Sequence, residues 1–221
     1  FILNASPHFV QEGLFRIKEN HFIQSQFIPD SNRLKSNAVD NIRNHTDSTS
    51  ELILNSDELK SFLASSCILH SIDGWHYLSN SIHALLSGDI AIAIHLAYYA
   101  ELRAASSLLA SEGIGVFNKK HLMINNNSEI HVSENSPTHT FIWDALNEWA
   151  NSPKPSNILK YFKYLGLDFQ AWQTYIPNAS ADIITSLFIK EWIKNWCMDI
   201  DNFKGDRKSR NVFSYRPFFG R

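Results

Sequence analysis

The sequence predicts a mainly α-helical domain, a bundle of four to six helices with a small β-hairpin inserted near residues 120–133. Apolar residues recur at helical spacing along most of the chain after residue 56. The segment 89–112 is rich in alanine and apolar on almost every side, which is typical of a helix at the centre of a bundle. Short apolar runs flank Asn125–Ser128, a pattern typical of a hairpin.

Length and composition describe an ordinary globular chain with one core. Its 221 residues are 44% hydrophobic and 19% charged. A net charge of -2 excludes a polyanion-binding surface over the whole molecule, so any such surface is local. Cys67 and Cys197 are too few for a secreted disulfide framework. No apolar run approaches the roughly 18 residues that span a membrane. We therefore expect a cytoplasmic protein with no membrane segment.

The first 50 residues are expected to form an arm that packs on a helical-bundle domain of residues 51–221. After Pro7 the sequence carries a moderate apolar stripe at helical spacing, which we expect Gly13 to break. Asparagine and serine then dominate, and we expect either loop or short, poorly amphipathic helix over 30–37 and 41–50.

A helix over about 57–86, either continuous or broken by a kink at Gly74, is predicted next, followed by a second helix over 89–112. Ser56 is a good N-cap for the first, with acidic residues in its first turn. Gly88 suits the left-handed residue that ends it, and Asp89 suits the N-cap of the second. Because the connection is so short, the two helices should form an antiparallel αα-hairpin.

The chain after residue 112 should fold into the hairpin and further helices. Gly113 and Gly115 should stop the second long helix. We expect His121 and His131, in the hairpin arms, to be exposed. Later helices are predicted from Pro137 to about Trp149, over 157–165, and over 181–201, from the helical spacing of their apolar residues.

The helix at 89–112 carries three polar residues in an apolar surround. At 100° per residue, His95 and Arg103 share one face with Tyr99, whereas Glu101 points almost the opposite way. Two interpretations stay open. Each group finds a partner on a neighbouring helix and fixes the packing register, or Glu101 or Arg103 faces a cleft and helps to hold a phosphate or to polarise a hydroxyl.

The C-terminal segment 203–221 is strongly basic in a chain of nearly neutral charge. It has one acidic residue, Asp206, and six basic ones: Lys204, Arg207, Lys208, Arg210, Arg216 and Arg221. Four aromatic residues are interleaved with them. Guanidinium groups bind phosphates and aromatic rings stack on unpaired bases, so this segment is either a nucleic-acid surface or a solvated tail.

The histidines do not predict a metal site, because no pair-of-pairs spacing supplies three or four converging ligands. We expect no metal and no cofactor. The sequence has no phosphate-binding glycine loop and no paired-cysteine motif.

Two segments resemble the HEPN superfamily of small helical-bundle domains. Ala97-Tyr98-Tyr99-Ala100, with the alanines and leucines that follow, is similar to the central helix of many such domains. The segment Arg210-Asn211-Val212-Phe213-Ser214-Tyr215 resembles the later HEPN motif, in which Arg and a polar residue precede a His by four to six positions. Here Tyr215 stands where that motif has its His.

The resemblance implies an RNA-directed domain of a bacterial defence or toxin system. Active members cut RNA without metal at a homodimer cleft, using the neighbouring 2′-hydroxyl as the nucleophile. By analogy, Arg210 would hold the phosphate, Asn211 would orient it and Tyr215 would supply a hydroxyl. The residues Arg103, Glu101 and His95 are further catalytic candidates on the helix at 89–112. Tyr215 is a poor base at neutral pH, so altered catalysis, the use of another His such as His95, or an inactive RNA-binding relative all remain open.

We therefore expect RNA as a partner, with DNA less expected, and a protein partner, most simply a second copy in a homodimer. In the nucleic-acid interpretations, four basic residues contact phosphates: Lys204, Arg207, Lys208 and Arg216. Two alternatives compete with a HEPN-like ribonuclease: a non-catalytic helical protein-interaction subunit, and a DNA-binding accessory protein.

Overall fold

The computed structural model describes residues 2–30, 32, 34, 56–117, 120–133 and 136–155, the short strands at 163–164 and 167–168, and residue 191. In chain order the elements are η1 (Ile2–Asn4), α1 (His8–Gln24), α3 (Ser56–Leu86), α4 (Ile90–Ser111), β1 (Ile114–Gly115), β2 (His121–Ile124), β3 (Ile130–Ser133), α5 (Thr138–Ala150), β4 (Lys163–Tyr164) and β5 (Leu167–Asp168). The predicted class, mainly helical with a small inserted hairpin, is confirmed.

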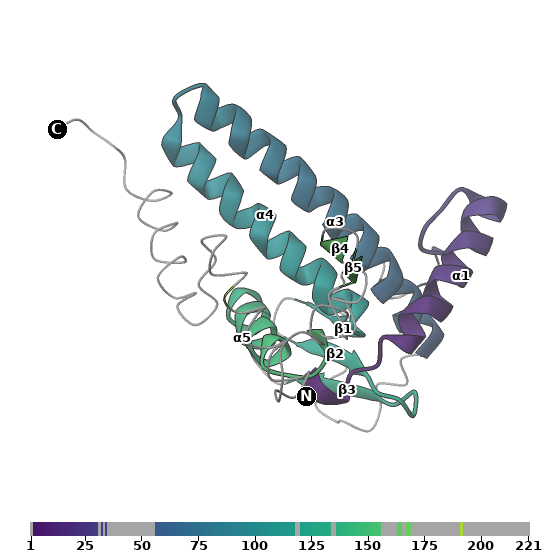
Figure 1. Ribbon diagram of the computed structural model, residues 1–221. Helices are drawn as coiled ribbons and strands as arrows, with labels where there is room; N and C mark the ends of the chain where they lie inside the picture. Colours follow the sequence, from purple (N-terminus) through teal and green to yellow (C-terminus); the bar gives the residue numbers. More distant parts are fainter. Residues whose placement is uncertain are drawn as a thin grey trace.

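Helices α3 and α4 form the predicted antiparallel hairpin, and it projects from the rest of the described fold (Figure 1). Gly88 ends α3 with a φ of +84°, in the left-handed region that glycine tolerates. The Asp89 side chain caps α4 by accepting a hydrogen bond from the Ile92 N–H at 3.2 Å. The local sequence therefore determines both the end of one helix and the start of the next.

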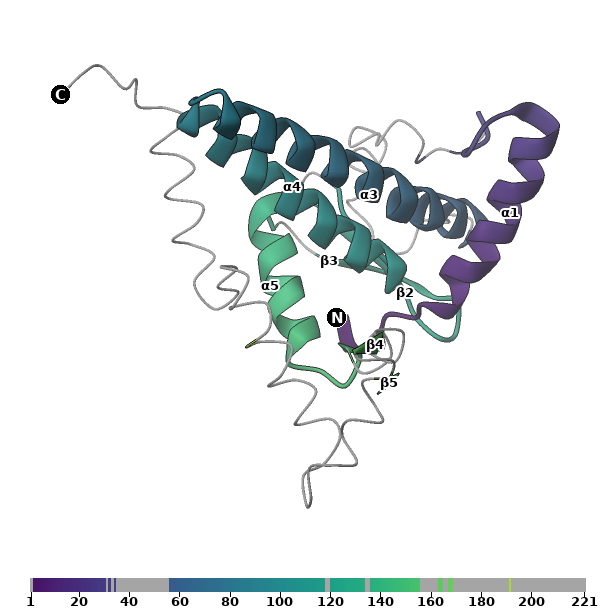
Figure 2. The ribbon, with the colours of Figure 1, turned by 45° about the horizontal axis from the view of Figure 1, so that its top comes forward.

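Two hydrophobic clusters flank the end of the hairpin that lies against the body. On the α1 side, Phe9 and Val10 pack with Leu63 of α3 and Leu122 of β2. On the other side, α4 packs against α5, whose Trp143 and Trp149 are buried with η1 beneath them. Figure 2 shows α1 and α5 on opposite sides of the hairpin. Residues from the first 34 positions of the chain thus contribute to both clusters. The predicted domain boundary near residue 50 stays a prediction.

Helix α1 runs through Gly13, so the expected break at this glycine is wrong. A Cβ at position 13 would clash with the Lys60 carbonyl oxygen of α3. The glycine therefore serves the close approach of two helices. Its backbone stays helical because the packing of α1 on α3 outweighs the propensity cost of about 1 kcal/mol for glycine in a helix.

The predicted β-hairpin is confirmed and is part of a three-stranded antiparallel sheet in the order β1-β2-β3. Leu122 pairs with Val132 and Ile124 with Ile130. The additional strand, β1, arises because Gly113, with a φ of +90°, turns the chain back beside β2 directly after α4. Two residues are too few to give a period-2 signal in the sequence.

His121 of β2 is fully buried, which corrects the expectation that it is exposed. Its ring stacks on Phe141 of α5 at 3.7 Å between centroids. Its Nδ1 accepts from the Phe117 N–H at 3.2 Å, and its Nε2–H donates to the Ser136 carbonyl at 2.9 Å. Both ring nitrogens are satisfied in the neutral form, and burial lowers the pKa of this imidazole. It is a structural residue that joins β2 to α5. His131 is exposed, as expected.

The helix predicted over 157–165 is wrong at its C-terminal end. Residues 163–164 form β4, which pairs with β5 so that Tyr164 lies opposite Leu167. Residues 157–162 and the helix predicted over 181–201 lie outside the described residues, apart from residue 191.

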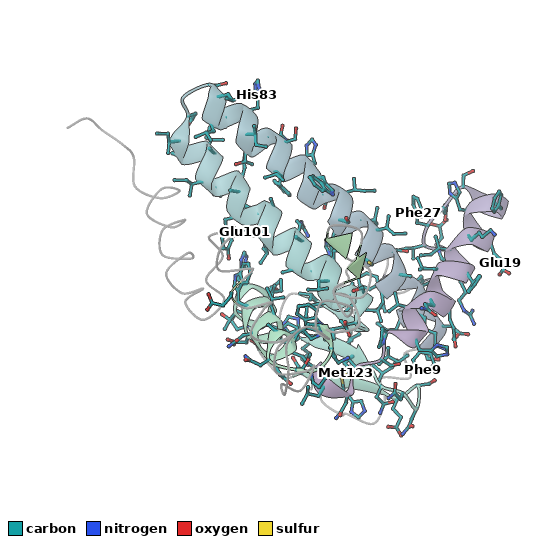
Figure 3. All side chains as sticks on the ribbon, in the orientation of Figure 1. Phe9, Glu19, Phe27, His83, Glu101 and Met123 are labelled. Carbon is teal, nitrogen blue, oxygen red and sulfur yellow. The ribbon has the colours of Figure 1, made fainter. Side chains whose placement is uncertain are left out.

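The far half of the hairpin exposes apolar side chains, which a helix at the centre of a bundle, as expected for 89–112, would have buried. In the first turn of α4, Ile90 is 58% exposed and Ile92 50%. On α3 six apolar side chains, which we call the outer apolar face, share one arc of about 140° at 100° per residue. They are Ile72, Trp75, Leu78, Ile82, Leu85 and Leu86, each between 38% and 82% exposed. Figure 3 places His83 at the tip of this hairpin.

Candidate functional site

Three of the predicted site residues, His95, Glu101 and Arg103, lie on α4, and Arg103 faces α3. Its Nε lies 3.7 Å from Asp73 Oδ2 of α3, and the ring of Tyr99, on the same face of α4, stacks on Tyr77 of α3 at 5.6 Å between centroids. Glu101 lies on the side of α4 that faces away from α3 (Figure 3). Arg103 and Glu101 therefore serve different faces of the helix, and they cannot act on one group together.

His95 is part of an aromatic and imidazole cluster built by three helices. Its ring meets Tyr99 edge-on at 5.0 Å between centroids. Across the cluster, Tyr98 Oη lies 2.8 Å from Nδ1 of His139, in the first turn of α5, and the two rings stack. The His139 ring also meets Tyr99 edge-on at 6.4 Å. Two imidazoles therefore share one partly exposed aromatic surface.

Sequence reasoning missed His139. Its one local signal is its place two residues after Pro137, where a helix was expected to begin. Only the packing of α5 on α4 brings it to Tyr98, because the two helices are joined through the whole β-sheet.

Arg103 connects with His70 and Asp73 of α3. Its Nη1–H donates to His70 Nδ1 at 3.2 Å. Because guanidinium has no acceptor, Nδ1 of His70 must carry the lone pair, so this imidazole is the neutral tautomer with its proton on Nε2. Burial first, and then the positive charge of Arg103, lower the pKa of His70 to about 4, whereas Asp73 opposes the shift.

These three residues stand at one end of a cavity of about 400 Å³ between α3, α4, the start of α5 and the chain after β1. The solvent side is marked by Leu69 and Asp73, whose side chains are 42% and 52% exposed. The inner wall is mostly apolar and includes Phe62, Phe117, Leu102 and Ile142. No local pattern in the chain predicts this cavity, because its lining comes from five separate segments.

A second polar group at the base of α4 is structural. Glu112 is buried and accepts from Trp149 Nε1–H at 3.1 Å and from Lys154 Nζ at 3.0 Å. Lys154 also donates to the Ala5 carbonyl at 2.7 Å. This network joins α4, α5 and the N-terminal segment, and with its charges paired it needs no ligand.

The seven C-terminal site residues lie outside the described residues. They are Lys204, Arg207, Lys208, Arg210, Asn211, Tyr215 and Arg216. The predicted meeting of Arg210 and Tyr215 with the helix at 89–112 therefore stays a prediction. Within the ranges that the structure describes, no three His, Cys, Asp or Glu side chains gather in a way that could hold a metal ion. No helix in those same ranges has both the length and the apolar character needed to cross a bilayer.

The chain matches no protein-family model, and no curated protein or solved structure is significantly similar to it.

Proposed function

We propose that this chain is a HEPN-like, RNA-directed domain of a bacterial defence or toxin system, acting as a metal-independent ribonuclease or as an RNA-binding relative of one. The observation that carries the proposal is the Arg210-Asn211 pair followed by Tyr215, inside a C-terminal segment with six basic residues and four interleaved aromatic rings. Cations for phosphates and rings for bases are the two elements of single-stranded RNA recognition.

The described part of the molecule adds a group that the motif lacks. His is the side chain best suited to move a proton near neutral pH, and Tyr215 occupies its place in the motif. His95 stands on a partly exposed aromatic surface of α4, with His139 across the same cluster. This surface supports the proposal because it offers an imidazole beside rings that can stack on a base.

In the proposed reaction the 2′-oxygen attacks the adjacent phosphorus and the bond from phosphorus to the 5′-oxygen breaks. Arg210 holds the phosphate oxygens, which gain charge in the transition state. Asn211 orients the same group. His95 takes the proton from the 2′-hydroxyl, and the Tyr215 hydroxyl donates a proton to the leaving 5′-oxygen. The products are a 2′,3′-cyclic phosphate and a 5′-hydroxyl.

The test is cleavage of a single-stranded RNA by the purified full chain, in the presence of EDTA. Cleavage should persist in EDTA, fall at least about 100-fold in Arg210→Ala, as expected for a lost phosphate contact, and fall in His95→Ala. Arg16→Ala is the matched control, since Arg16 lies on α1 in an ion pair with Asp57 at 2.8 Å. If Arg210→Ala changes neither cleavage nor binding of RNA, the proposal fails.

A second candidate function, a helical protein-interaction subunit, is favoured by the outer apolar face of α3. Trp75 is 71% exposed and Leu86 82%, on a hairpin with no Lys or Arg between residues 61 and 102. Contiguous exposed apolar surface of this kind marks protein interfaces, and the lack of cations disfavours nucleic acid there. If this is the function, Trp75→Ser lowers self-association or partner binding while RNA binding stays unchanged.

A further inference from the structure

The cavity beside Arg103 has a polar mouth and an apolar interior. Seven of its lining side chains are aliphatic or aromatic: Ile28, Phe62, Leu69, Leu102, Val116, Phe117 and Ile142. Two of the three hydroxyl groups that line it are already used, since Ser106 donates to the Leu102 carbonyl at 2.8 Å and Thr138 to the Phe117 carbonyl at 2.8 Å. The third belongs to Ser66. With seven apolar side chains against these hydroxyls, the interior suits an apolar group.

The mouth carries an unsatisfied donor. Arg103 Nε is buried and finds no hydrogen-bond acceptor among the described residues, because Asp73 Oδ2 stands at 3.7 Å. A buried polar group without a partner costs roughly 1–3 kcal/mol. The geometry leaves one edge of the guanidinium, formed by Nε and Nη2, on the side away from the Nη1–H that serves His70. An Arg edge of this kind matches the two oxygens of a carboxylate.

The charges at the mouth select the class of anion. Arg103 supplies one positive charge, and His70 is neutral because it accepts from Arg103. Asp73 supplies one negative charge close to the same guanidinium. A monoanion is therefore better balanced there than a phosphate dianion, which would add two negative charges beside Asp73.

We propose that this cavity is a binding site for a small amphiphilic carboxylate, whose anionic group pairs with Arg103 and whose apolar body lies between Phe62, Phe117 and Ile142. The volume of about 400 Å³ falls in the range of small-molecule sites. Asp73 is the internal competitor for the guanidinium, and its 52% exposed side chain can turn to solvent when the ligand binds. This site is independent of the proposed RNA chemistry, since it uses no residue of the C-terminal motif.

The experiment measures binding of octanoate to the full chain by calorimetry near pH 7, with 1-octanol and octyl phosphate as matched probes. Octanoate should bind saturably with one site per chain and at least about 10-fold tighter than 1-octanol, the effect of one charge-assisted contact. Octyl phosphate should bind no tighter than octanoate. If it binds much tighter, or if octanoate and octanol bind alike, the carboxylate assignment is overturned; absence of saturable octanoate binding overturns the site itself.

Variants locate the site and separate binding from folding. Arg103→Gln should weaken octanoate binding at least about 10-fold and leave 1-octanol unaffected. Asp73→Asn should tighten octanoate binding, because it removes the competing carboxylate; a purely structural role would not produce a gain. The Asp73→Asn variant therefore tests the pairing of the carboxylate with Arg103 even if Arg103→Gln does not fold. Trp75→Ser, on the outer apolar face, should change nothing, and loss of binding in that variant would place the ligand there instead.

Discussion

The two halves of helix α3 differ in environment although both are rich in apolar residues. From Leu59 to Ser66 every residue is buried, including Lys60 and three serines. From Ile72 to Leu86 the apolar side chains of the outer face are exposed. The difference teaches that here tertiary neighbours, and not composition, decide burial: α1 and the sheet cover the first half, and none of the described elements covers the outer apolar face of the second.

Lys60 illustrates how the covered half accepts a charge. Its Nζ lies 2.7 Å from Glu12 Oε2 and 4.5 Å from the centre of the Phe9 ring, both on α1. The hydrogen bond from Lys60 lowers the pKa of the Glu12 carboxyl. The partner helix that buries Lys60 thus also supplies its counter-ion, which keeps the charged form stable there.

The comparison is tested most strongly by matched truncations in the two halves. Leu63→Ala, at a fully buried position of the covered half, should lower the free energy of unfolding by about 2–5 kcal/mol. Ile82→Ala, on the outer apolar face, should cost less than about 1 kcal/mol. Urea unfolding of both variants measures the difference, and equal losses would contradict the described burial.

Two glycines test the same contrast through the backbone. Gly13→Ala should cost about 2–3 kcal/mol, because its Cβ would meet the Lys60 carbonyl and force α1 from α3. Gly88→Ala, at the open tip, meets no atom within 4 Å and should cost only about 1–2 kcal/mol from its left-handed φ. Thermal unfolding measures the loss of stability in each variant. A larger loss in Gly88→Ala than in Gly13→Ala would be inconsistent with the α1–α3 contact.

The free energy of unfolding should depend on pH through His70, which lies between the two halves of α3. Its pKa is about 4 in the folded chain and near 6.5 when unfolded. Below pH 6.5 the unfolded state therefore binds the proton first, so stability is lost as the pH falls from 6.5 towards 4, by up to about 2–3 kcal/mol. His70→Gln should flatten this dependence in unfolding measured at pH 7 and pH 5. An unchanged slope would argue against a buried neutral His70.

The smallest effect on stability is expected at Trp75. Trp75→Ser should change the free energy of unfolding by less than about 0.5 kcal/mol, because the side chain is 71% exposed. Sedimentation should show weaker self-association in this variant than in the parent chain. A large loss of stability would mean that Trp75 is covered within the single chain.

The local features of the fold were predictable because local chemistry determines them. The cap at Asp89, the left-handed Gly88 and the Asn125 turn, where Asn125 Oδ1 accepts from the N–H groups of Asn127 and Glu129, are all decided within a few residues. Gly13 and His121 were misjudged because a distant neighbour overrides the local preference: Lys60 of α3 and Phe141 of α5. The strand β4 was misjudged for a local reason, since two residues are too few to give a period-2 signal, although its partner β5 begins only three residues later.

The candidate site was only partly predictable for the same reason. Helical periodicity placed His95, Tyr99 and Arg103 on one face, and Tyr77 and Asp73 confirm that face for the latter two. Periodicity carries no information on which helix lies opposite. The contacts of His70 with Arg103 and of His139 with Tyr98 were therefore found only in the structure, where α3 and α5 pack against α4.

The proposed RNA function is tested most directly by the salt dependence of RNA binding. A fluorescent single-stranded RNA should bind the full chain with an affinity that falls steeply between about 50 and 200 mM salt. Arg210→Ala should weaken binding and reduce the slope of log K against log salt by about 0.7, one phosphate contact on a single strand, whereas Arg16→Ala should not. Binding that is absent, insensitive to salt, equal for a matched DNA strand, or unchanged in Arg210→Ala would contradict an RNA-directed domain.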